Sequence, residues 1–265
     1  MSFGPSSKSC VTTVATPGLD AAKPQDSEVF NGDPYSMGSN GAFEPRGEVV
    51  FTIPLPSSFL SSLPNPQTNV SVPAGSGTGG GCISSEGPFG RQQAHLGPTI
   101  LGAYGSIPTG PNNLFKYNPR CIKRDLNPYI MNKYTTYRNI TQAITNYTTV
   151  GEFQAVVQSD SRYRLTIGNI GVHAGGHVGV GGDPMADQPS TPGDPIWFLH
   201  HANQAVQKRT WTVADTGTIL NFVPSPNTTL DTTVDLAYIG GSLSPPLPVR
   251  DLLSTVGGPF CYKYV

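Results

Sequence analysis

The clearest pattern of apolar and polar residues is helical and lies in the second half of the chain. Three starts combine a capping residue with apolar positions that follow at the spacing of one helix face. They begin at Asn127-Pro128, at the capping box Thr149-Val150-Gly151-Glu152 and at Asp194-Pro195. The last start is the strongest, because an unbroken apolar run, Ile196 to Leu199, follows it toward Trp211. We predict a helix after each start.

Elsewhere the pattern is weaker. Residues 1–81 are interpreted as coil, apart from one short strand predicted by the alternation of Val49, Phe51, Ile53 and Leu55. Turn residues recur through 27–43, and the Gly/Ser-rich segment 73–81 is typical of a linker. The proline-rich tail from Thr216 is predicted to be mostly extended or turn.

Composition strengthens this interpretation. Gly 31 and Pro 26 together make about a fifth of the 265 residues, against an average of roughly 12%. So many chain breakers argue against a regular layered sheet. The predicted fold class is therefore mainly α, with long irregular loops and few short strands.

Charge and hydropathy exclude several classes of partner. The net charge is −1, and no cluster of basic residues extends beyond 121–124, so we expect no nucleic acid and no anionic membrane surface as partner. No apolar run reaches the ~20 residues that span a bilayer. The first five residues lack the basic and apolar regions of a signal peptide.

The four cysteines are widely spaced and form no C-x-x-C pair, which favours disulfides over a zinc knuckle. We predict that Cys82 pairs with Cys121, because both flank the loop block before the first strong helix. Cys10 and Cys261 would then join the two ends of the chain. Alternatively they are free, or Cys261 pairs outside this chain.

Glycosylation sequons occur at Asn69, Asn139, Asn146 and Asn227. Together with the cysteines, these sequons indicate a secreted glycoprotein. The first residues do not support secretion, because they lack the pattern of a signal peptide.

Histidines supply the candidate chemistry. The chain has five, and four of them lie between positions 173 and 201. His173 and His177 are four residues apart, so a helix would place both rings on one face, close enough to share an ion. His200 and His201 are adjacent and point about 100° apart on a helix, so only one of them is expected to face that ion.

Imidazole ligands suit copper and zinc. A zinc metalloprotease would need Glu directly after the first histidine, and Ala174 stands there instead. The alternative to a metal site is a set of structural histidines that are hydrogen-bonded in the core.

Two segments, Val172–His177 and Thr191–Asn203, resemble the copper B region of tyrosinases, catechol oxidases and their fungal relatives. That pattern is H-x-x-x-H, a glycine-rich loop, and D-P-x-F-x-L-H-H-A-N. Further segments resemble secreted fungal members in the family's order: Ser27–Gly32, Gly87–Phe89, Leu96–Pro98, Tyr117–Cys121 and Pro259–Tyr262. The resemblance begins after the point where the family's copper A helices end.

The resemblance implies a fold that is part of the tyrosinase-type four-helix-bundle dicopper fold. Residues 1–265 would be the carboxyl-terminal portion of a single copper-binding domain. It would comprise a loop-rich segment at 1–125, a helical copper B region at 126–212 and an extended tail at 213–265.

It also implies roles for individual residues. His173, His177 and His201 would bind copper, and His200 would point away from the ion. Asp194 would cap the second ligand helix and Phe198 would pack beside the metal. Asn203 would lie among the residues that surround the ligands. His95 is assigned to loop structure.

The sequence departs from the family in three places. The three histidines of copper A are not found, so we expect one copper ion here against two in the complete site. The usual Asp-Arg pair after the ligand helix is replaced by Ala205 and Val206. Some members have Asn after the first ligand, and Ala174 in its place favours oxidation of diphenols or aminophenols over hydroxylation of monophenols.

The leading hypothesis is a tyrosinase-like oxidoreductase that converts o-diphenols or related phenols and aminophenols to quinones. Its partners would be a small phenolic substrate, dioxygen and a separate copper A polypeptide. The alternatives are a catalytically inactive truncated paralogue or gene-model fragment that binds one copper or none, and a mononuclear copper protein with different chemistry. Because the family's reaction draws one electron from each of two copper ions, we expect no coupled turnover from this chain alone.

Overall fold

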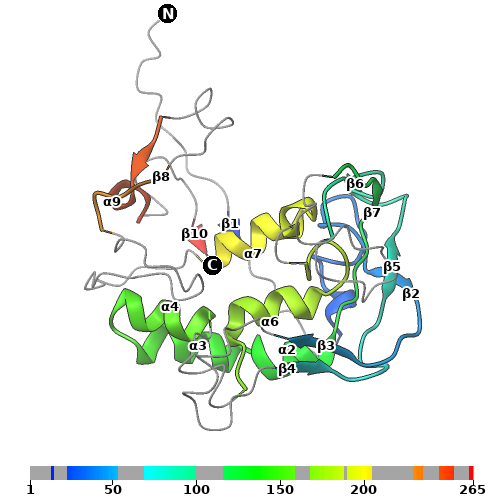
Figure 1. Ribbon diagram of the computed structural model, residues 1–265, viewed down its shortest axis with the longest axis horizontal. Coiled ribbons are helices and arrows are strands. Elements are labelled where there is room, and N and C mark those ends of the chain that lie inside the picture. The colour runs from blue at the N-terminus through cyan, green and yellow to red at the C-terminus, as the bar shows by residue number, and fades with distance from the viewer. Residues whose placement is uncertain are drawn as a thin grey trace, which may run out of the picture. The chain divides into compact units, whose positions relative to one another are not determined.

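The computed structural model describes the chain in segments: 13–14, 23–52, 69–98, 116–158, 168–187, 190–204, 229–234, 245–253 and 263–264. Two compact units are distinguished. One comprises 17–147 and 152–204, and the other comprises 1–16, 148–151 and 205–265. All five histidines lie in the first unit, which is described first. The helices and strands are labelled in Figure 1.

A helix begins at each of the three predicted starts. Helix α2 spans Pro128–Tyr134, and the Asn127 side chain caps it by accepting the Ile130 N–H at 3.1 Å. Helix α4 spans Val150–Gln158, of which 152–158 belong to this unit, and it confirms the second start. After the 3-10 turn η2, Thr191–Gly193, helix α7 spans Ile196–Gln204 and confirms the third. Its continuation toward Trp211 lies outside the described residues.

Two helices complete this set. The histidine-bearing helix α6 spans Gly171–Val180. Helix α3, Tyr137–Asn146, was not predicted from the sequence; Thr136 caps it by accepting the Asn139 N–H at 3.2 Å. The 3-10 turn η1, Pro24–Asp26, is the first described element of the unit.

Strands in this unit are short and pair two by two. The predicted strand is confirmed as β3, Val49–Thr52, which pairs antiparallel with β4, Asn69–Val72. Ile53 and Leu55, which were expected to extend it, lie outside the described residues. The other antiparallel pairs are β2 (Gly41–Phe43) with β5 (Gly80–Ile83), and β6 (Gln93–Ala94) with β7 (Arg120–Cys121).

The interpretation of 73–81 as a linker is wrong at its end, because Gly80 and Gly81 belong to β5. The glycines here allow close approach of backbones. A Cβ on Gly41 would lie 2.2 Å from the carbonyl oxygens of both Arg124 and Gly81. These glycines therefore allow the backbones to pair closely, and they do not form a flexible linker.

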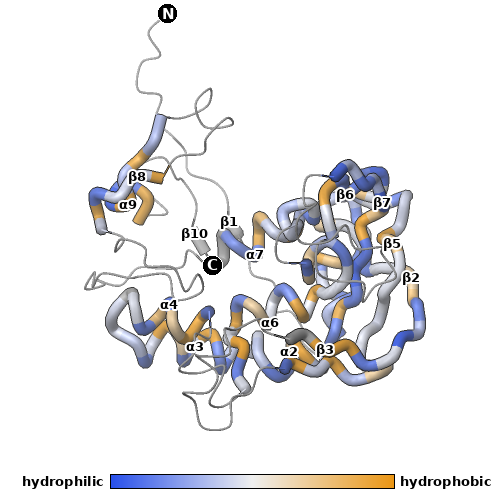
Figure 2. Tube along the Cα trace, viewed as in Figure 1, coloured by the Kyte–Doolittle hydropathy of each residue, from blue (hydrophilic) through white to orange (hydrophobic). Residues whose placement is uncertain are grey.

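The core is built on both sides of α2, whose apolar positions are visible with those of its neighbours in Figure 2. Ile130 and Tyr134 pack with Val49, Val70 and Val72 of the β3–β4 pair. Another face of the helix joins the cluster that fixes α6 and α7, whose buried members are Phe30, Leu126, Met131, Val180, Met185 and Ile196.

Glycines let α6 approach α2 closely. A Cβ on Gly175 would lie 2.5 Å from Tyr134 Cβ, and one on Gly179 would lie 2.9 Å from Met131 Cγ. The glycines that weaken α6 as an isolated helix are therefore used by its packing.

A disulfide and two ion pairs connect segments that are distant in the sequence. Cys82 of β5 is bonded to Cys121 of β7, with 5.7 Å between their Cα atoms, and this confirms the predicted pairing. Cys10 and Cys261 lie outside the described residues. Arg120 Nε donates to Asp183 at 2.6 Å, and Arg124 Nη2 donates to Asp194 at 2.7 Å.

The second unit has little regular structure among its described residues. Strand β1 (Thr13–Val14) pairs parallel with β10 (Lys263–Tyr264), and β8 (Thr233–Val234) pairs antiparallel with β9 (Leu247–Pro248). The short helix α9, Val249–Leu252, was not predicted in the tail. Throughout the described residues, no helix is both long and apolar enough to cross a membrane.

Candidate metal centre

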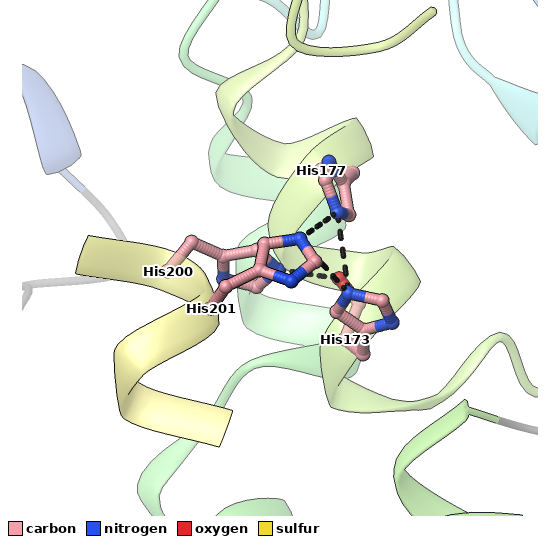
Figure 3. Close-up of side chains that lie close together, drawn as sticks. All are labelled: His173, His177, His200 and His201. Atoms are coloured by element: carbon pink, nitrogen blue, oxygen red, sulfur yellow. Dashed lines mark hydrogen bonds between the residues drawn. The ribbon is translucent and has the colours of Figure 1, made fainter. Parts of the chain in front are cut away.

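Three imidazoles converge from two helices (Figure 3). His173 and His177 lie one turn apart on α6, and their Nε2 atoms are 3.3 Å apart. His201 of α7 places its Nε2 atom 3.4 Å from that of His173 and 3.1 Å from that of His177. The three nitrogen atoms form a nearly equilateral triangle.

The outer nitrogens of two rings fix the tautomers. His173 Nδ1 is 2.6 Å from Gln158 Oε1, and His177 Nδ1 is 3.1 Å from the backbone oxygen of Met185. A carbonyl oxygen can only accept, so each Nδ1 carries the hydrogen. In the neutral ring each Nε2 atom therefore presents a lone pair to the triangle.

This arrangement fits a metal ion. Facing lone pairs at this separation repel unless a proton or a cation lies between them. Metal–imidazole bonds of about 2.0–2.1 Å place three ligand nitrogens roughly 3.3–3.5 Å apart. The observed separations of 3.3 and 3.4 Å fall within that range, and the third, 3.1 Å, lies just below it. All three donors are imidazoles, a ligand set that suits copper or zinc.

His200 is the fourth histidine of the cluster, in which one ring nitrogen from each member lies within 4.8 Å of the others. Its Nε2 donates to the backbone carbonyl of His173 at 3.0 Å, which joins α7 to α6. The ring lies against Gly176, where a Cβ would come within 2.2 Å of His200 Cε1. This hydrogen bond occupies the Nε2 of His200 outside the triangle.

The aromatic ring beside the triangle is that of Trp197. It stacks on His201 with ring centroids 4.1 Å apart and 24° between the planes. Phe198, which was expected beside the metal, is 60% exposed and meets Trp197 edge-on at 5.0 Å. Trp197 precedes His201 by four residues and therefore shares its face of the helix. The side chain of Asn203 lies outside the described residues.

Asp194 precedes α7 and is fully buried. Its Oδ1 accepts the Ile196 N–H at 3.1 Å at the start of α7. Both carboxylate oxygens also accept from Arg124, whose Nη1 donates to the carbonyls of Met37 and Ser39 at 2.7 and 3.1 Å. The first turn of the helix that bears His201 is thus tied to two other segments.

Burial favours the neutral form of His177, His200 and His201. Desolvation lowers the pKa of His177 to about 4, assisted by the charge of His201 and opposed by the hydrogen bond to Met185. Desolvation also lowers the pKa of His201, and it lowers that of His200 to well below the ordinary value of 6.5. At neutral pH these rings are unprotonated donors, as metal binding requires.

The fifth histidine stands apart. His95 lies in the loop after β6, is exposed, and faces Tyr117 with ring centroids 5.4 Å apart. Within the described segments, the four-histidine cluster is the one group of His, Cys, Asp or Glu that meets the spacing for a shared ion. Ala174 belongs to α6, whereas Ala205 and Val206 lie outside the described residues.

Sequence reasoning missed Gln158. It lies fifteen positions before His173, at the end of α4, and nothing in its local pattern marks it as a neighbour of the site. The available signal was the capping box that predicts α4, which leaves Gln158 near the end of a helix leading toward the histidines.

Comparison with known proteins agrees with the site. Residues 7–213 match the family model of the common central domain of tyrosinase. The chain is 30% identical to Oxidase hkm6 of Aspergillus hancockii over 93% of this chain and 81% of that protein. It is 29% identical to Tyrosinase P of Aspergillus terreus over 90% of this chain and 63% of that protein.

The chain is also similar to a solved structure. The polyphenol oxidase of Thermothelomyces thermophila, as its G292N mutant, matches with a TM-score of 0.70 at 32% identity. The match covers 92% of this chain and 63% of that one. The chain thus spans less than two thirds of the length of this protein and of Tyrosinase P.

The chain belongs to the tyrosinase family. It is a family of copper oxidoreductases that act on phenolic substrates with oxygen, and the histidine cluster fits a metal site of that kind.

Proposed function

We propose that His173, His177 and His201 bind one copper ion through their Nε2 atoms. In this proposal the ion is the copper B half of a type 3 centre that oxidises o-diphenols, or related phenols and aminophenols, to quinones. The convergence of the three Nε2 atoms, with hydrogens held on the outer nitrogens of His173 and His177, supports the assignment. Membership of the tyrosinase family supports copper as the metal.

Bound copper supplies the redox chemistry, and the chain's own residues prepare its site. Gln158 and the Met185 carbonyl hold the hydrogens on the outer nitrogens of two ligands. Trp197 covers one face of His201 and His200 ties the two ligand helices together. Burial keeps protons from competing for the ligand nitrogens at neutral pH.

A coupled two-copper centre needs a second set of ligands. The 265 residues contain one histidine beyond the cluster, His95. We therefore propose that the copper A ligands come from outside these residues, in another segment or polypeptide. Helices α6 and α7 would then form the copper B half of the four-helix bundle, in a protein that acts outside the cell.

Copper stoichiometry tests the triad. The purified chain should bind one copper, and His177→Ala or His201→Ala should abolish stoichiometric uptake, because two imidazoles rarely hold a metal in a defined geometry. His200→Ala should weaken uptake only indirectly, and His95→Ala serves as the control without effect. Loss of uptake in His95→Ala, or its retention in His177→Ala, would contradict the triad.

Adding a copper A segment to the copper-loaded chain tests the proposed oxidase activity. Chain loaded with copper should not turn over catechol through a two-copper cycle until a copper A segment from a related protein is added. Activity of the 265 residues alone that survives chelation controls would contradict this requirement. If the completed pair remains inactive while one copper stays bound, a non-catalytic paralogue is favoured; the replacements Ala205 and Val206 are the sequence feature that favours it.

A further inference from the structure

The contact between Gln158 Oε1 and His173 Nδ1 is short, at 2.6 Å, against 3.1 Å for His177 with the Met185 carbonyl and 3.0 Å for His200 with the His173 carbonyl. It joins α4 to α6, and it reaches the nitrogen opposite the one that faces the triangle. Gln158 is half-buried, whereas Gln154, one turn earlier on the same helix, is exposed.

His173 and His177 differ in the kind of partner that their Nδ1 atoms contact. His177 has the backbone carbonyl of Met185 on its Nδ1 atom, a partner that no side-chain substitution removes. The corresponding partner of His173 is a side chain, so the tautomer of this one ligand depends on the identity of residue 158. If the hydrogen moved to Nε2, the lone pair that faces the triangle would be lost.

We propose that Gln158 is a positioning residue for metal binding: its amide oxygen holds the hydrogen of His173 on Nδ1 and so directs the Nε2 lone pair at the ion. The inference rests on the proposed metal site and names a residue outside the motif of histidines. It acts through His173 and does not touch the ion.

The uncharged amide also sets the strength of this ligand. A carboxylate on the outer nitrogen of a metal-bound histidine raises the basicity of the ring, and loss of such a partner typically costs about 10–100-fold in metal affinity. Gln158→Glu keeps an acceptor and adds charge. Gln158→Met keeps the length of the side chain and removes the acceptor.

The experiment compares full-length wild type, Gln158→Met, Gln158→Glu and the matched control Gln154→Met. Zn²⁺ is the probe, because it is diamagnetic and binds imidazole. Its dissociation constant is measured by chelator competition, and long-range ¹H–¹⁵N correlation of each metal-free protein reports which nitrogen of His173 is protonated.

We expect wild type, Gln158→Glu and Gln154→Met to have the hydrogen of His173 on Nδ1. Gln158→Met should show a tautomer mixture and bind Zn²⁺ about 10–100-fold more weakly. Gln158→Glu should bind at least as tightly as wild type. Because glutamate has a similar shape and keeps an acceptor oxygen, tight binding by Gln158→Glu and weak binding by Gln158→Met would show that the acceptor controls the tautomer of His173. A role in packing alone would not require the acceptor.

Three results would each overturn the proposal: a wild-type His173 protonated on Nε2, unchanged affinity in Gln158→Met, or equal weakening in Gln154→Met. If Gln158→Met fails to fold, the proposal is still tested by two measurements: the tautomer of His173 in wild type and the Zn²⁺ affinity of Gln158→Glu. The tautomer is read without metal, so a wild type that holds the Nδ1 hydrogen but takes up no copper would overturn the proposed function and leave the role of Gln158 intact.

Discussion

The imidazole of His200 occupies the space in which a side chain at Gly176 would stand. A Cβ built on Gly176 would lie 2.2 Å from Cε1 and 2.8 Å from Nδ1 of that ring. The same ring donates to the His173 carbonyl at 3.0 Å. A glycine inside a helix costs about 1 kcal/mol relative to alanine, and here it allows the two ligand helices to meet.

Gly176→Ala should therefore weaken metal binding although it improves helix propensity. The new methyl group would displace His200 and move α7 with His201 away from α6, so the Zn²⁺ dissociation constant should rise at least tenfold. Gly47→Ala is the matched control, because a Cβ there meets nothing within 4 Å. Equal affinities in the two variants would show that His200 can move aside without shifting the triad.

Asp194→Asn should destabilise the fold strongly. The substitution retains an oxygen to accept the Ile196 N–H, so it isolates the loss of charge opposite Arg124. Breaking a fully buried ion pair costs about 3–5 kcal/mol, because the remaining charge is left uncompensated. Denaturant unfolding measures the change.

The exposed pair of Arg250 with Asp231 supplies the comparison. Asp231→Asn should change stability by about 0–1 kcal/mol, as is usual for ion pairs in contact with solvent. Similar losses in Asp231→Asn and Asp194→Asn would mean that burial does not set the contribution of the Arg124 pair.

The sequence predicted the elements whose signals are local. Asn127 and the following proline predicted α2, and the spacing of His173 and His177 predicted a shared helix face that α6 presents. Helix α3 was missed because its β-branched residues, such as Ile140 and Thr141, have weak helix propensity. Its signal was the cap at Thr136 before apolar positions three and four residues apart.

Tertiary contacts account for the remaining differences. Gly80 and Gly81 have the composition of a linker, and only the strand facing them shows that the missing side chains allow close pairing. Phe198 was expected to pack beside the metal, and the ring that stacks on His201 is that of Trp197. Gln158, at the end of α4, reaches the site through its contact with His173 of α6, which its position in the sequence does not predict.

Stability of the metal-free protein should fall as pH decreases from about 6.5 toward 4. Burial lowers the pKa of His177 to about 4, and it lowers that of His200 as well. In this window the unfolded chain, with an ordinary histidine pKa of 6.5, binds more protons than the folded chain. The free energy of unfolding therefore decreases as pH falls.

Urea unfolding between pH 7.5 and 4.5 measures this dependence. The slope should be smaller in His177→Leu than in wild type, because the substitution removes one buried titrating ring. His95→Ala should keep the wild-type slope, since His95 is exposed. A wild-type stability that is flat across the window would contradict the lowered pKa values.

When the chain is expressed through a secretory pathway, glycans should occupy Asn69 and Asn146 but not Asn139. The first two side chains are exposed, and Asn146 ends α3. Asn139 instead donates its Nδ2 to the carbonyls of Lys133 and Tyr134 at 3.0 and 3.1 Å, next to the cap of α3. A glycan on that nitrogen would remove a hydrogen it uses and push apart the turn between α2 and α3. Glycopeptide mass spectrometry measures occupancy at each site, and full occupancy of Asn139 would show that this turn opens before the fold is complete.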